Sequence, residues 1–201
     1  GVAQQFAVKG YLGSRFTLYA HAAFGFTAGE NVMSAQQAEV LRDFIGGKRG
    51  QGLRLGAGLG IGRDFSNVKN ALGRITASYV TGNLKAGGNL LFEKAFSGDR
   101  DAIDVITSLG VQYRLLGQLY GGVEAVGEDL EGFWDEEEAE GGAKLLIGPS
   151  LNMVPRNSRF SFSLSGGPVF YATHSTVTTP GAIRELPSES GLTVRAKVVF
   201  N

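Results

Sequence analysis

The sequence predicts an all-β fold: a single antiparallel up-and-down β-barrel of about ten strands, in a range of roughly 8–12, that spans residues 1–201. Glycine supplies 31 of the 201 residues, about twice its usual share of ~7%, which disfavours a helical bundle because glycine destabilises helices. Apolar and polar residues alternate through many segments of roughly 10–15 residues, and this is the period of a strand with one covered face.

The composition excludes several other classes of protein. With 43% hydrophobic residues, 10% aromatic residues and no net charge, the chain can bury a core and is not intrinsically disordered. The absence of cysteine rules out disulfides and cysteine-based zinc sites. The 19 basic residues balance 19 acidic residues, so we expect no nucleic-acid partner.

No targeting segment is evident. Residues 1–13 lack the basic and apolar regions of a signal peptide, which fits a cytosolic chain or one that is numbered after processing. No stretch reaches the ~18 consecutive apolar residues that a membrane-spanning helix needs, whereas the strands of a membrane barrel would give a much weaker signal.

Four segments show the alternation most clearly, and they are 15–26, 53–62, 159–173 and 191–201. A less regular alternation occurs at about 1–12, 71–82, 83–96, 103–116, 117–130 and 142–155. Turn residues separate these segments, and Thr81-Gly82-Asn83 forms the tightest predicted hairpin.

One short helix is expected inside the long connection 28–51. Ser34 and Gln37 have the spacing of a capping box, and Gly46-Gly47 would end the helix. The apolar stripe of this helix would comprise Ala38, Leu41, Phe44 and Ile45. With an even number of strands and both chain ends on one side, this connection falls where turns should be short. Either the strand count is off by one, or the connection is an unusual feature.

The two faces of the expected strands differ in charge, which bears on the side that points inward. Charged residues of both signs lie at mid-strand on one face, and they are Arg54, Arg74, Lys85, Glu93, Asp104, Arg114, Glu124, Lys144, Arg195 and Lys197. Gly56, Gly58, Gly60 and Gly62 alternate on the same face, where they would leave room for long side chains from neighbouring strands. A solvated sheet surface is the alternative interpretation of this charged face.

The opposite face is apolar along whole strands. A transmembrane barrel turns such a face toward lipid and keeps its polar groups inside, so the pattern predicts a charged lumen. The residues expected to face lipid are Phe16, Leu18, Phe24, Leu55, Leu59, Phe160, Phe162, Leu164, Val194, Val198 and Phe200.

The final segment, Gly191–Asn201, resembles the closing strand of bacterial outer-membrane β-barrel proteins, with apolar residues at every second position and Phe200 next to last. Leu109–Val126 resembles a strand–turn–strand unit of the same class. The resemblance implies a Gram-negative outer membrane as the location, outer-membrane lipid as the surroundings, the barrel-insertion machinery as a partner during biogenesis, and a porin-like role in transport. The lack of cysteine agrees with passage through an oxidising periplasm.

Two segments carry residues that could perform chemistry. The loop 128–140 is rich in carboxylates, and a weak candidate site for a divalent cation comprises Asp129, Asp135, Glu136 and Glu138. A run of like charges is also typical of a solvated loop, and Phe133 and Trp134 beside it fit an aromatic girdle at a lipid interface. His174 is followed by Ser175, and this pair would suit a His-activated nucleophile at a barrel rim.

These observations lead to one expected function and two alternatives. About ten strands enclose little space, so we expect a narrow or plugged charged lumen and a non-enzymatic protein without a cofactor. Its role would be structural, as a conduit for small solutes, or in presenting surface loops. The alternatives are a rim hydrolase that uses His174 and a soluble β-barrel that binds an apolar ligand in a reversed interior.

Overall fold

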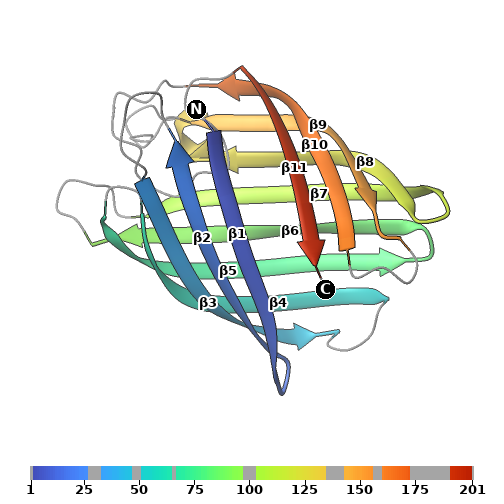
Figure 1. The fold of residues 1–201 in the computed structure, drawn as a ribbon, viewed down its shortest axis with the longest axis horizontal. Coiled ribbons are helices and arrows are strands. Elements are labelled where there is room, and N and C mark those ends of the chain that lie inside the picture. The colour runs from blue at the N-terminus through green and yellow to red at the C-terminus, as the bar shows by residue number, and fades with distance from the viewer. Residues whose placement is uncertain are drawn as a thin grey trace.

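A computed structural model describes residues 2–26, 33–46, 51–64, 67–96, 103–134, 143–155, 160–172 and 191–200. These residues form one antiparallel sheet of 11 strands, in which every strand pairs with the next one along the chain (Figure 1). The strands are β1 (Val2–Gly13), β2 (Phe16–Phe26), β3 (Met33–Ile45), β4 (Gly52–Arg63), β5 (Lys69–Thr81), β6 (Leu84–Ala95), β7 (Asp104–Leu116), β8 (Leu119–Glu128), β9 (Lys144–Met153), β10 (Phe160–Tyr171) and β11 (Leu192–Phe200), with the 3-10 turn η1 (Leu130–Phe133) after β8. The predicted all-β class and up-and-down order are therefore confirmed.

The helix predicted inside 28–51 is wrong, because the strand β3 occupies its place. β3 pairs with β2 on one side and with β4 on the other. Its side chains alternate, with Ala35 and Glu39 buried and Val40 and Phe44 exposed. Ladders to two neighbouring strands outweigh the weak local preference that the apolar stripe gives for a helix.

The residues that suggested helix caps have other roles in β3. The side chain of Ser34 accepts a hydrogen bond from Arg63, and that of Gln37 donates one to Glu39. Gly46 has a φ of +87°, a conformation that glycine adopts without steric strain. The glycine thus allows a turn at the end of a strand instead of terminating a helix.

The extra strand also resolves the conflict over the connection 28–51, because the sequence-based count was one strand too low. The connections that follow odd-numbered strands are 14–15, 46–51, 82–83, 117–118 and 154–159. Those that follow even-numbered strands are 27–32, 64–68, 96–103, 129–143 and 172–191. The longest connections therefore share one end of the sheet, which we call the long-connection end, and the opposite end is the short-connection end.

The sheet is strongly curved, so that β1, β2, β10 and β11 cross in front of the middle strands in Figure 1. Pairing runs unbroken from β1 to β11, but within the described residues no pairing joins these two strands. The closed barrel expected from the sequence is therefore an open sheet in this structure. Because the strand number is odd, β1 and β11 run in the same direction, as their arrows show (Figure 1).

The two faces of the sheet differ in exposure. We call the face that carries Glu39, Leu72 and Leu146 the inner face, because these side chains are 0–3% exposed, and the opposite face the outer face. Near the long-connection end the inner face holds two apolar clusters, which are Leu72 with Leu91 and Ile106, and Val126 with Leu146 and Val169. Within the described residues, no helix is long and apolar enough to cross a membrane.

Candidate functional site

A buried ion pair lies at the centre of the inner face. The Arg74 guanidinium on β5 donates from Nε to Glu39 Oε2 at 2.7 Å and from Nη2 to Glu39 Oε1 at 2.8 Å. The Glu39 side chain is fully buried, and that of Arg74 is 16% exposed. Such a two-point contact between a planar guanidinium and a carboxylate is both strong and directional.

The ion pair reaches across β4, which lies between β3 and β5, and glycine makes this possible. Glu39 is opposite Gly60 in the β3–β4 register, and Arg74 is opposite Gly58 in the β4–β5 register. A Cβ atom on Gly60 would lie 2.6 Å from Glu39 Cγ, and one on Gly58 would lie 2.9 Å from Leu41 Cγ. The side chains of β3 thus occupy the space over β4, which is the role that the sequence predicted for these glycines.

Neutral side chains extend this pair into a network over five strands. Gln37 donates to the Glu39 carboxylate at 3.2 Å on one side. On the other side Arg74 donates to Asn89 Oδ1 at 2.9 Å, and Asn89 donates in turn to Ser108 on β7. The network holds β3, β5, β6 and β7 in one arrangement through polar contacts that cross β4.

A second long-range ion pair joins β8 to β11. Arg195 donates to Glu124 across β9 and β10. At this crossing Gly148 lies opposite Glu124, and a Cβ atom on Gly148 would lie 2.9 Å from the Cα atom of Gly167. Again, an ion pair crosses the sheet where the intervening strands carry glycine.

A third ion pair is the most deeply buried. Lys144 Nζ lies 3.7 Å from Glu128 Oε2, and both side chains are 1% exposed. The two residues are register partners on β8 and β9 at the long-connection end. The two charges lie beside the apolar cluster of Val126, Leu146 and Val169, so each depends strongly on the other.

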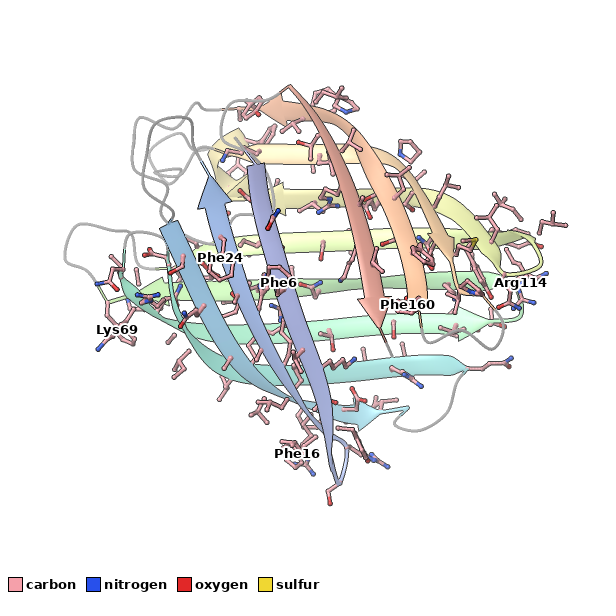
Figure 2. All side chains as sticks on the ribbon, in the orientation of Figure 1. Phe6, Phe16, Phe24, Lys69, Arg114 and Phe160 are labelled. Atoms are coloured by element: carbon pink, nitrogen blue, oxygen red, sulfur yellow. The ribbon has the colours of Figure 1, made fainter. Side chains whose placement is uncertain are left out.

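A different cluster lies on the inner face at the short-connection end, where Figure 2 labels Arg114. The phenol oxygen of Tyr120 accepts hydrogen bonds from Arg114 Nε at 3.1 Å and from Arg114 Nη2 at 2.7 Å. The ammonium group of Lys85 lies 3.7 Å from the centroid of the Tyr120 ring. Tyr120 itself is only 7% exposed, so two cations converge on one buried phenol.

All ten charged residues singled out in the sequence fall on the inner face by strand alternation and register. The structure brings Arg74, Glu124, Lys144 and Arg195 into the ion pairs described above, and places Lys85 and Arg114 around Tyr120. Glu93 is 4% exposed and lies opposite Asp104 in the β6–β7 register. The lumen that these residues would line remains a prediction.

The residues expected to face lipid lie together on the outer face. Leu59, Phe160, Phe162, Leu164, Val194 and Val198 are 40–76% exposed. Leu18 is 39% exposed, and Phe16, Phe24 and Leu55 are half-buried. Phe200 belongs to β11, but its side chain lies outside the described part of the structure. Their contact with lipid likewise remains a prediction.

The candidates for chemistry fall mostly on residues that the structure does not describe. Asp129, at the start of η1, is 4% exposed, whereas Asp135, Glu136 and Glu138 lie outside the described residues. His174 lies outside them as well. Within the described residues, no group of three or more potential ligands could hold a metal ion.

Two central residues were missed in the sequence. Glu39 falls within the predicted helix, although the alternation of the polar Gln37 and Glu39 with the apolar Ala38 and Val40 could have indicated a strand. Tyr120 carried no signal as a site residue, because its role depends on Arg114 and Lys85, which reach it from β7 and β6.

Comparisons of the chain with protein-family models, with curated proteins and with solved structures find no match.

Proposed function

We propose that this protein is a β-barrel of a bacterial outer membrane, that it is not an enzyme, and that its charged interior is narrow and closed near the long-connection end. The observation that carries the proposal is the sidedness of the sheet. Large apolar side chains are exposed over the outer face, while the charged residues of the middle of the sheet lie on the inner face and are paired there.

The outer face is more apolar than the surface of a soluble monomer. Leu59 and Ile61 on β4, Leu109 on β7 and Val194 on β11 are each 60–76% exposed. From β7 to β11, the described outer-face positions carry no charged residue. Soluble monomers rarely expose so large a continuous apolar surface, whereas the lipid-facing side of a membrane barrel has this character.

Aromatic residues on the outer face occur near both ends of the sheet. Phe44, Tyr79, Tyr113 and Phe160 are 45–55% exposed near the short-connection end, where Figure 2 labels Phe160. Phe96 and Phe170 are 68% and 51% exposed near the long-connection end, and Trp134, which follows η1 at that end, is 78% exposed. Two such bands, with aliphatic residues between them, support a membrane position because aromatic girdles mark the two interfaces of membrane barrels.

A membrane position requires that β1 and β11 pair with each other, because unpaired backbone groups are very costly in hydrocarbon. We therefore propose a parallel β1–β11 seam that closes the sheet. Since the chain has no cysteine, cysteine pairs introduced at facing positions of the two strands would report this seam directly. A disulfide that forms in vesicles supports closure, and its absence over a full scan of registers argues against it.

The interior supports a structural or loop-presenting role, or passage of small solutes only. The apolar clusters that contain Leu72 and Leu146 cover the inner face near the long-connection end, and the central ion pairs span its middle. Planar bilayer recordings should therefore show no conductance of the size of a general porin, since open channels belong to barrels with many more strands.

A pair of arginine substitutions tests the membrane position. Leu59 at the middle of β4 and Leu116 at the end of β7 are 76% and 80% exposed. In a membrane, Leu59→Arg should destabilise the protein by about 2–4 kcal/mol, while Leu116→Arg should cost about 0–1 kcal/mol because it lies near the interface. In water, both exposed positions would accept arginine with an effect of about 0.5 kcal/mol or less.

The measurement is the free energy of unfolding of both variants in lipid vesicles. Equal stabilities of the two variants would contradict the proposal, as would purification of the wild-type chain as a water-soluble monomer without detergent. The soluble alternative is disfavoured already by the sidedness, because it requires the apolar face to surround the ligand. The hydrolase alternative gains no support from the described residues.

A further inference from the structure

We propose that the inner face at the short-connection end binds the phosphate group of an anionic ligand through Lys85, Arg114 and Tyr120. The starting observation is that two cations share one buried phenol. Lys85 Nζ lies 3.7 Å, and Arg114 Cζ 5.3 Å, from the ring centroid of Tyr120. Both positive groups lie next to the same ring and therefore repel each other, and an anion bound beside them would reduce this repulsion.

The neighbouring inner-face residues offer hydrogen bonds and no negative charge. Asn152, Ser163 and Lys197 follow Tyr120 along one line of paired residues from β8 to β11. On the next line of inner-face residues, farther from the short-connection end, Gln112 donates to Ser150 at 3.2 Å. The Asn152 side-chain oxygen is buried without a hydrogen-bond partner, and as an acceptor it could take a hydrogen bond from a protonated phosphate oxygen or from a bridging water.

Carboxylates are kept away from the cluster. In the described part of the chain, neither Lys85 nor Arg114 contacts a carboxylate. On β8 the first carboxylate beyond Tyr120 is Glu124, which is paired with Arg195. At the same end of the sheet Asp43 is on β3, three strands away from β6. The positive charge here is thus available to a ligand, in contrast to the paired charges at the centre.

The geometry favours phosphate over other anions. Arg114 uses Nε and Nη2 to hold the Tyr120 oxygen, which fixes the guanidinium plane and leaves its remaining N–H groups to donate. A planar guanidinium combined with a flexible ammonium group matches the several oxygens of a phosphate. Tyr120 acts here as a positioning residue, since it holds both cations in place.

The test is a calorimetric titration at constant ionic strength. Inorganic phosphate is added to the whole chain in a zwitterionic detergent, and the heat of binding is measured. Arg114→Gln and Lys85→Met should each weaken binding by about tenfold or more, and Tyr120→Phe should weaken it less because the ring remains. Lys69→Met is the control, because Lys69 is an exposed cation at the opposite end of the sheet (Figure 2). Proper folding of each variant is checked by circular dichroism.

Phosphate can come from a free solute or from a lipid headgroup, and a second titration with mixed micelles that contain phosphatidylglycerol separates the two. If the wild-type chain binds inorganic phosphate and the site variants do not, the ligand is a free solute. If the site variants lose only the binding of phosphatidylglycerol, the ligand is a lipid headgroup. Absence of saturable binding of both probes would overturn the proposal, and so would binding that Lys69→Met reduces as much as Arg114→Gln. The site does not depend on the membrane position, so failure of one proposal leaves the other testable.

Discussion

The Glu39–Arg74 pair permits a prediction about Glu39→Gln: this substitution should destabilise the wild-type chain but stabilise the Arg74→Met variant. Replacing Arg74 by Met leaves a fully buried carboxylate without its cation, and losing one partner of a buried pair costs about 3–5 kcal/mol. Gln37 still donates to Glu39 at 3.2 Å, so we expect the lower value, about 3 kcal/mol. Glu39→Gln alone should cost about 1–2 kcal/mol, because Arg74 is partly solvated and keeps its contact with Asn89.

The double variant, Glu39→Gln with Arg74→Met, should be more stable than Arg74→Met alone by about 1–2 kcal/mol, since no buried charge remains. Urea unfolding in detergent micelles, followed by circular dichroism and by emission of Trp134, gives the four stabilities of this cycle. Trp134 is the single tryptophan of the chain, so its emission is assigned without ambiguity. If the two losses simply add in the double variant, the ion pair does not hold the strands together as argued.

Two further predictions concern the inner face. Gly60→Ala should destabilise the sheet by about 1–3 kcal/mol, because its Cβ would lie 2.6 Å from Glu39 Cγ and against a backbone carbonyl. The matched control Gly110→Ala should be neutral or slightly stabilising, since its nearest neighbours would be 3.9 Å away; equal unfolding midpoints would contradict the steric argument. Lys144→Met should cost about 3–5 kcal/mol, because it removes the cation 3.7 Å from the buried Glu128 carboxylate. A change below about 1 kcal/mol in thermal or urea unfolding would show that the pair contributes little.

Much of the fold could be predicted from the sequence because alternation reports directly on strands. The segments expected at 83–96 and 103–116 became β6 (Leu84–Ala95) and β7 (Asp104–Leu116). The hairpin at Thr81-Gly82-Asn83 is confirmed, with Gly82 at a φ of +45°. β3 failed because its apolar residues also fit a helical period, and only pairing with β2 and β4 distinguishes the two structures.

The site was less predictable, because alternation assigns a residue to a face but does not identify its partner. Glu39 and Arg74 are 35 residues apart in the sequence, and Glu124 and Arg195 are 71 apart. Their contacts depend on strand order and register, which follow from the complete set of pairings and not from any local segment. The alternating glycines were the exception, since their spacing indicated that side chains from neighbouring strands needed space above β4.

The arrangement of charge along the inner face gives the sheet two different ends. At the centre, Arg74 neutralises the charge of Glu39, and toward the long-connection end Lys144 neutralises that of Glu128. Both pairs lie on a covered part of the inner face. At the short-connection end, Lys85 and Arg114 meet a phenol instead of a carboxylate. Paired charges stabilise the sheet and leave little attraction for a solute, whereas cations without a carboxylate attract anions from solution. Structural and ligand-binding roles are thus separated along the strands, and substitutions at Arg74 and at Arg114 should affect stability and binding respectively.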